Sequence, residues 1–149
     1  MTLHLLKLCV GVESIDDLAE WIDEQRLYAR RAGQNFEQKH TTRMVPRRLD
    51  EILRAPDGPG SLYWVIKGQI ACRQRLIDIR PFTDAHGIGR CHLVLEPEVV
   101  PVLPRPYRAF QGWRYFSPED APPDLGARVE GLDTMPEALR RELAGLGLI

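Results

Sequence analysis

Basic and aromatic side chains alternate through the middle of the sequence, a combination typical of surfaces that bind nucleic acids. Guanidinium groups bind phosphates through paired hydrogen bonds, and aromatic faces stack on unpaired bases. We therefore predict that the chain binds RNA or a nucleotide-like anion, without catalysis. The predicted ligand-binding residues are Arg43, Arg47, Arg48, Tyr63, Lys67, Arg73, Arg75, Tyr107, Arg108 and Trp113.

Two kinds of contact are expected from this set. The stacking would come from Tyr63 or Tyr107. The phosphate contacts would come from Arg43, Arg47, Arg48, Arg73 and Arg75. Arg105, Arg114 and Tyr115 belong to the same basic and aromatic pattern. The alternative is that the large aromatic residues form the core and the arginines a solvated rim.

The charge is distributed unevenly, although the formal net charge is only −1. Residues 1–25 contain one Lys and six acids, residues 26–114 contain 16 Lys and Arg and eight acids, and residues 115–149 contain three Arg and seven acids. A basic middle favours an anionic ligand. Alternatively, the acidic ends fold over the basic middle and neutralise it.

Cysteine and histidine offer a weaker chemistry. Cys9, Cys72 and Cys91 form no CxxC pair, so we expect free, buried thiols. Cys91 and His92 are neighbours in a predicted strand and must point to opposite faces. A site assembled from distant residues, such as His40 with Cys72, stays open. We expect no catalytic residue, metal or cofactor; an enzyme acting on a small phosphorylated substrate is the third hypothesis, which a deep pocket containing His40 or His92 would favour.

A hairpin from Ser61 to Arg80 is the element around which these residues must be placed. Its two arms are rich in aromatic and β-branched residues, and Lys67-Gly68 separates them. In the second arm the apolar residues change parity, from Ile70 and Cys72 to Ile77 and Ile79, which predicts a β-bulge or a barrel corner. The hairpin therefore indicates a curled sheet.

A helix over residues 15–31 is expected to cover this sheet, with Ser14 as its N-cap, Gly33 beyond its end, and Leu18, Trp21 and Ile22 toward the core. We also predict strands over 3–10, 41–45 and 91–95, and helices over 47–54 and 136–144. The Pro-rich segment 97–106 must be extended, at an edge or in an irregular crossing. A protein-interaction module using that edge is the second functional hypothesis.

The whole chain is predicted to be one domain, 1–149. No apolar run approaches the length of a membrane span. The amino terminus lacks a basic leader and a small-residue cleavage site, so we expect no signal peptide and a cytoplasmic location. The sequence does not indicate an oligomeric state.

Three motifs carry a family resemblance. HTTRMVPRR (residues 40–48), YWVIKG (63–68) and RAFQGWRYF (108–116) resemble DUF1489, an alphaproteobacterial family to which no activity is attached. The order of elements more distantly resembles the PUA-like superfamily, whose ASCH and EVE members are small curled barrels thought to bind RNA or modified nucleotides. That resemblance implies a groove between Pro46–Arg48 and the hairpin. The expected fold class is α+β, a strongly curled, barrel-like sheet with a packed N-terminal helix.

Overall fold

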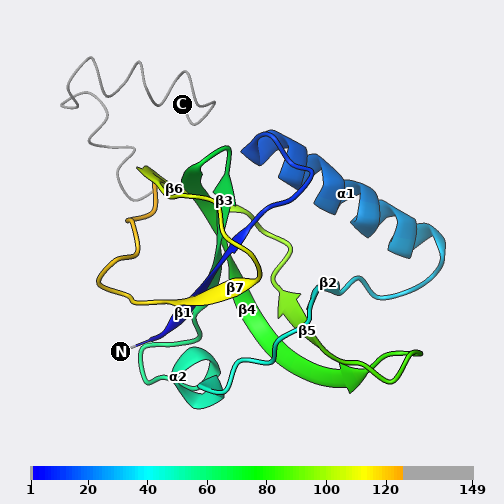
Figure 1. The fold of residues 1–149 in the computed structure, drawn as a ribbon. Coiled ribbons are helices and arrows are strands. Elements are labelled where there is room, and N and C mark those ends of the chain that lie inside the picture. The colour runs from blue at the N-terminus through cyan, green and yellow to red at the C-terminus, as the bar shows by residue number, and fades with distance from the viewer. Residues whose placement is uncertain (1, 126–149) are drawn as a thin grey trace.

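The computed structural model describes residues 2–125, which form one seven-stranded sheet and two helices (Figure 1). The helix predicted over 136–144 lies outside these residues. Neither described helix is long and apolar enough to cross a membrane. The helices are α1 (Ile15–Arg31) and α2 (Leu49–Leu53), and the strands are β1 (His4–Leu8), β2 (Gln38–Thr42), β3 (Ser61–Ile66), β4 (Gln69–Thr83), β5 (Gly89–Leu95), β6 (Val100–Pro106) and β7 (Trp113–Phe116).

The strands are arranged around β4, which is 15 residues long. The order is β2-β5-β4-β3-β1-β7, and β6 also pairs with β4. The predicted hairpin is present as the antiparallel pair β3–β4. β6 pairs with the first part of β4 and β5 with its second part. Within residues 2–125, β1 and β3 are the only paired strands that run parallel. Between β1 and β3 the chain forms α1, then β2 at the far end of the strand order, and then α2.

The expected fold class is wrong in its main feature, because the sheet is open and is not strongly curled. β2 and β7 lie at opposite ends of the strand order and do not pair with each other. The parity change in the second hairpin arm does mark a bulge, between Leu76 and Asp78. That bulge accompanies a change in the partner of β4 rather than a closure of the sheet. The described residues are mostly β-sheet with little helix. Because their sheet is open, the expected PUA-like barrel is absent from the described chain.

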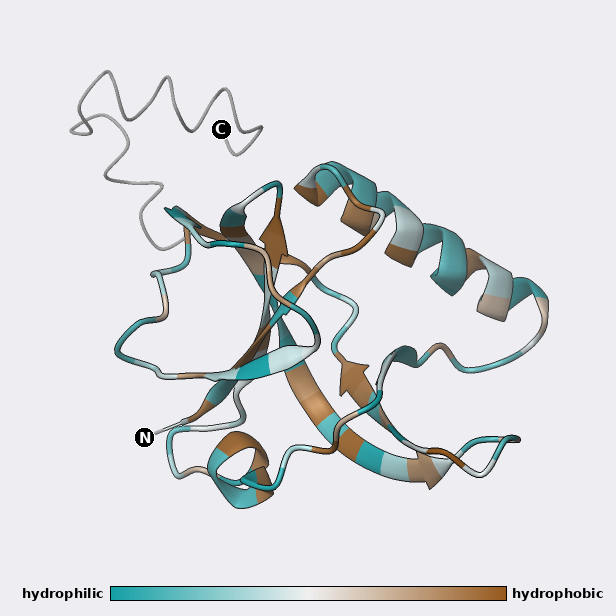
Figure 2. Cartoon of the chain, in the orientation of Figure 1, coloured by the Kyte–Doolittle hydropathy of each residue, from teal (hydrophilic) through white to brown (hydrophobic). Residues whose placement is uncertain are grey.

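Helix α1 begins and ends where the sequence predicts. The Ser14 hydroxyl accepts a hydrogen bond from the Asp17 amide at 3.1 Å and caps the first turn. Leu18 and Ile22 are buried against the sheet, and the hydrophilic face of α1 points away from it (Figure 2). Trp21 differs from the prediction, because its side chain is 45% exposed.

The core has one apolar cluster on each face of the sheet. Every residue of β3 is buried, so this strand contributes to both clusters. Leu62, Trp64 and Ile66 join the cluster under α1. On the other face, Tyr63 and Val65 pack with residues that follow in the sequence, including Phe110 and Phe116. The aromatic residues near the end of the described chain therefore complete the second face.

A buried amide connects four parts of the fold. Gln74 is 0% exposed, and its amide nitrogen donates to the Gln38 side-chain oxygen at 2.7 Å and to the Glu96 carbonyl at 3.0 Å. Its oxygen accepts from Trp64 Nε1 at 2.9 Å and from Gln38 at 3.3 Å. All four hydrogen-bonding positions of this amide are therefore occupied.

Gly60 marks a close approach of two backbone segments. Its N–H donates to the Ile52 carbonyl at 2.6 Å and its carbonyl accepts from Leu76 at 2.9 Å. A Cβ at this position would overlap the Leu3 carbonyl oxygen. We expect Gly60→Ala to lower the free energy of unfolding by about 2–3 kcal/mol, because backbone must move.

Gly89→Ala is the matched control, since a Cβ there meets nothing within 4 Å. Urea denaturation of the two variants measures the difference. Equal stability of Gly60→Ala and Gly89→Ala would contradict the packing described for Gly60.

Candidate functional site

Strand β7 forms one end of the sheet and pairs with β1 alone in the described chain. Because side chains alternate along a strand, Trp113 and Tyr115 point to one face and Arg114 and Phe116 to the other. Phe116 is buried, whereas Arg114 and Tyr115 are exposed. The edge thus presents a cation and an aromatic ring on opposite faces.

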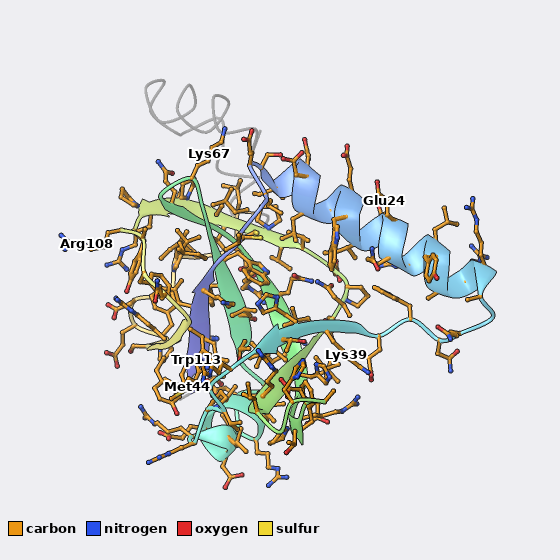
Figure 3. All side chains as sticks on the ribbon, turned by 45° about the vertical axis from the view of Figure 1, so that its right-hand side comes forward. Glu24, Lys39, Met44, Lys67, Arg108 and Trp113 are labelled. Atoms are coloured by element: carbon orange, nitrogen blue, oxygen red, sulfur yellow. The ribbon has the colours of Figure 1, made fainter. Side chains whose placement is uncertain are left out.

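Tyr115 binds the segment that precedes α2. Its hydroxyl oxygen accepts from the backbone N–H groups of Arg47 at 2.8 Å and Arg48 at 3.2 Å. The Arg48 guanidinium lies 5.3 Å from the centre of the Tyr115 ring. Trp113 packs edge-on against that ring at 4.9 Å and donates from Nε1 to the Met44 carbonyl at 2.7 Å. Trp113 and Met44 are both labelled in Figure 3. Two aromatic residues therefore position this basic segment at the β7 edge.

The Arg48 side chain is itself paired. Its Nε and Nη2 atoms donate to the two Glu51 oxygens, both at 2.6 Å. These hydrogen bonds raise the pKa of Arg48 and lower the pKa of Glu51. Both side chains are about half exposed, so solvent screens the pair and it adds little to the stability of the fold. An anionic ligand can compete with Glu51 for this guanidinium.

Arg105 on β6 and Arg114 on β7 form the second basic group. The Arg105 side chain donates to the Asp120 carbonyl at 2.6 Å. Arg114 donates to the Tyr107 hydroxyl at 3.3 Å and lies 4.5 Å from the centre of the Phe110 ring. A hollow of about 340 Å³, here called the β7-edge pocket, is lined by Leu3, Arg48, Arg105, Tyr107, Tyr115, Phe116, Ser117 and Asp120.

Several of the predicted ligand-binding residues gather near this pocket. Arg48 and Tyr107 line the pocket. Arg47 and Trp113 both contact Tyr115, which also lines it. Arg43 is exposed beside Met44, whose carbonyl accepts from Trp113. Arg108 is exposed in the segment between β6 and β7. Arg105 and Tyr115 came from the wider basic and aromatic pattern, and both line the pocket.

The remaining predicted residues lie elsewhere. Arg73 makes two hydrogen bonds to Asp124, at 2.7 and 2.6 Å, so this arginine pairs with the acidic end of the chain. Tyr63 is only 4% exposed and is not free to stack on a base. Lys67 occupies the β3–β4 turn, 3.8 Å from Glu13. Arg75 is exposed and lines a separate groove with Arg73.

A second hollow lies under the start of α1, and sequence reasoning did not find it. This α1 pocket has a volume of about 320 Å³. Burial lowers the pKa of His40 to about 4 and raises the pKa of Cys9 to about 12. The imidazole is therefore neutral and the thiol protonated near pH 7. The lining consists of Lys7, Leu8, Cys9, Val10, Gly11, Val12, Leu18, Trp21, Gln38, Lys39, His40 and Trp64.

The structure also bears on the histidine and cysteine hypotheses. All three thiols are free, and Cys72 and Cys91 are buried as predicted, whereas Cys9 is partly exposed. Within residues 2–125, no group of three or more His, Cys, Asp or Glu side chains is placed to bind a metal. His92 stacks on Phe82 at 4.1 Å. His40 is thus the histidine that lines a pocket with a thiol, and that thiol is Cys9.

Comparison with known proteins adds a family but no activity. The model of a family described as a protein of unknown function (DUF1489) matches residues 5–149. No curated protein and no solved structure matches the chain. The function must therefore be argued from the geometry of the two pockets.

The hydroxyl of Tyr115 provides a first test of the β7 edge. Tyr115→Phe keeps the ring but leaves the amides of Arg47 and Arg48 without this acceptor. We expect thermal or urea unfolding to show a loss of about 0.5–1.5 kcal/mol, because water replaces only part of the two hydrogen bonds. Tyr28→Phe, at a side chain that is 73% exposed, is the control. Identical losses in both variants would rule out the described role of Tyr115.

The low pKa of His40 predicts a pH dependence of stability. Its value in the folded chain, about 4, lies below the ordinary 6.5, so the unfolded chain binds the proton first as pH falls. The contribution is complete above about pH 6.5 and is lost toward pH 4. Between pH 7 and 5 we expect His40→Gln to lose about 1–2 kcal/mol less stability than the wild type.

His86→Gln, at an exposed turn position, serves as the control for removing a histidine. Urea denaturation at the two pH values gives the measurement. If His40→Gln and the wild type lose the same stability, His40 is not held neutral by burial.

Proposed function

Since the chain belongs to the DUF1489 family of unknown function, we propose from its geometry that the β7 edge binds single-stranded RNA or a nucleotide-like anion. The observation that carries the proposal is the β7-edge pocket, where Arg48, Arg105, Tyr107 and Tyr115 converge from separate segments of the chain. Such a pocket combines guanidinium groups for phosphate with aromatic faces for a base.

The charges around the pocket support an anionic ligand. Arg43, Arg47, Arg105, Arg108 and Arg114 form no ion pair with the acidic side chains of residues 2–125. Unpaired cations on neighbouring segments raise the local positive potential and attract phosphate groups. This surface therefore stays basic although the chain as a whole has a formal net charge of −1.

Each group at the pocket has a suitable role. Arg105 and Arg48 would donate to phosphate oxygens, and Tyr107 would stack on a base. Asp120 also lines the pocket, and its carboxylate would accept from a ribose hydroxyl or a base amino group. A contact to the ribose 2′-hydroxyl distinguishes RNA from DNA. A cytoplasmic location and an alphaproteobacterial source, both expected from the sequence, fit this proposal and stay predictions.

The hypothesis of an interaction module on the Pro-rich edge has less support. One side of β6 pairs with β4. On the other side, Leu103 donates to the Pro123 carbonyl and Leu125 donates to the Pro101 carbonyl, both at 2.9 Å. Backbone groups on both sides of β6 are therefore already used, and a partner strand finds little free edge there.

The test is binding of fluorescent single-stranded RNA, double-stranded RNA and DNA at about 50 and 200 mM salt, measured by anisotropy. We expect single-stranded RNA to bind most tightly. The double variant Arg47→Gln/Arg105→Gln should weaken binding and reduce the slope of log K against log salt by about 1–1.5. Tyr107→Ala should cost about 1–3 kcal/mol of binding free energy through lost stacking.

The double variant Arg30→Gln/Arg31→Gln removes the same charge from the last turn of α1 and should leave the slope unchanged. The proposal fails if no nucleic acid binds at low salt. It also fails if the two double variants weaken binding equally, since the effect would then follow net charge alone.

A further inference from the structure

The α1 pocket is a second site, separate from the β7 edge. It lies where the end of β1 and the first turns of α1 meet β2 and β3, and it shares no lining residue with the β7-edge pocket. Its volume of about 320 Å³ is at the small end of the range for ligand pockets, so one or two fused rings would fill it.

Two indole rings give the pocket an aromatic character. Trp64 is fixed, because its Nε1 donates to Gln74 at 2.9 Å and His40 packs edge-on against its ring at 5.1 Å. Trp21 is 45% exposed and Val10 is 87% exposed, so the rim keeps apolar surface in water. A planar apolar molecule would cover this surface while resting on a rigid inner wall.

The charges of the lining are all positive. It contains Lys7 and Lys39 and no acidic residue. Lys39 lies 3.4 Å from Glu37, whereas Lys7 forms no ion pair with any acidic side chain of residues 2–125. Acidic side chains of α1 such as Glu24 point away from the sheet (Figure 3). Burial lowers the pKa of Lys7.

The single unpaired cation, Lys7, limits the charge of the anionic group. One ammonium is neutralised by one carboxylate, whereas a phosphate monoester carries about −1.5 to −2 and would leave negative charge unbalanced in the pocket. His40 adds a neutral imidazole to the wall, and its Nε2 atom is buried without a hydrogen-bond partner in the described chain. A buried polar atom of this kind favours a ligand or a rearrangement that supplies a partner.

We propose that the α1 pocket binds a small planar aromatic carboxylate, with its ring against Trp21, over the inner wall that Trp64 helps to form, and its carboxylate on Lys7. The ring replaces water on the exposed indole, and the carboxylate neutralises the one cation that the fold leaves unpaired in this pocket. No covalent step is involved. This site is independent of nucleic-acid binding at the β7 edge, because the two pockets have no residue in common.

The probe for the test is 2-naphthoate, and 2-naphthamide is its neutral counterpart. Calorimetry with the full chain should show saturable binding of the carboxylate, at least about tenfold tighter than that of the amide. Lys7→Met keeps an apolar stem of similar size and should abolish this preference. Lys39→Met is the matched control, because Lys39 lines the same pocket but is paired with Glu37, and it should change affinity by less than about threefold.

The indole N–H signals in proton–nitrogen correlation NMR spectra provide an independent measurement of where the ligand binds. Naphthoate should shift the Trp21 signal and leave that of Trp113, at the β7 edge, in place. Thermal unfolding of each variant checks that the fold is kept. The proposal is overturned if the binding of naphthoate does not saturate or if Lys7→Met and Lys39→Met weaken that binding equally. It is also overturned if naphthoate shifts the Trp113 signal and not the Trp21 signal.

Discussion

The fold depends on satisfying the buried amide of Gln74. An unpaired amide in this position would cost about 1–3 kcal/mol for each missing hydrogen bond. The partners of Gln74 lie on three other segments: Trp64 on β3, Gln38 on β2 and the carbonyl of Glu96 after β5. Gln74 also lies just before Leu76, where β5 begins to pair with β4. One side chain therefore links the strands on both sides of β4 at the point where β4 changes neighbours. A polar residue in the core here specifies the register as well as filling space.

The two candidate sites are related to the Gln74 network in different ways. Trp64 and Gln38 belong to the Gln74 network and also form part of the wall of the α1 pocket, so the inner wall of this pocket is rigid, while Trp21 and Val10 at its rim are exposed. The β7-edge pocket is assembled differently, from segments joined by the Tyr115 hydroxyl and by Arg105. One site is thus attached to buried polar contacts of the core, and the other to exposed contacts at the end of the sheet.

Local signals in the sequence predicted local structure well. The Ser14 cap, the hairpin and the bulge after Leu76 all follow from the type and spacing of neighbouring residues. The pairing of β1 with β3 and β7 was not predictable in this way, because it depends on residues far apart in the chain. The wrong prediction of a curled barrel has the same cause. The sequence revealed the local bend at the bulge, but it did not reveal which strands pair at the two ends of the sheet and therefore whether the sheet closes.

The candidate sites show the same difference between local features, which the sequence revealed, and contacts between distant residues, which it did not. Arginines at the β7 edge were identified by residue type, but type alone did not separate Arg47, which has no acidic partner in the described chain, from Arg73, whose partner Asp124 lies much later in the sequence. The α1 pocket was missed because Lys7, Trp21 and His40 have no shared spacing, and Trp21 occupies a helical position that the apolar pattern assigns to the core. A cation without an acidic neighbour becomes visible only when the segments are brought together.

The pairing of β7 with β1 also determines the order in which the molecule can be completed during synthesis. Leu5, near the start of the chain, lies opposite Tyr115, so the outer part of the sheet must wait until nearly the whole described chain has left the ribosome. Contacts between such distant residues carry a large loop-closure cost and form late. A nascent chain that has made β3 and β4 already has its central strands but no β7 edge, and its arginine-rich surface comes into existence only with the last strand.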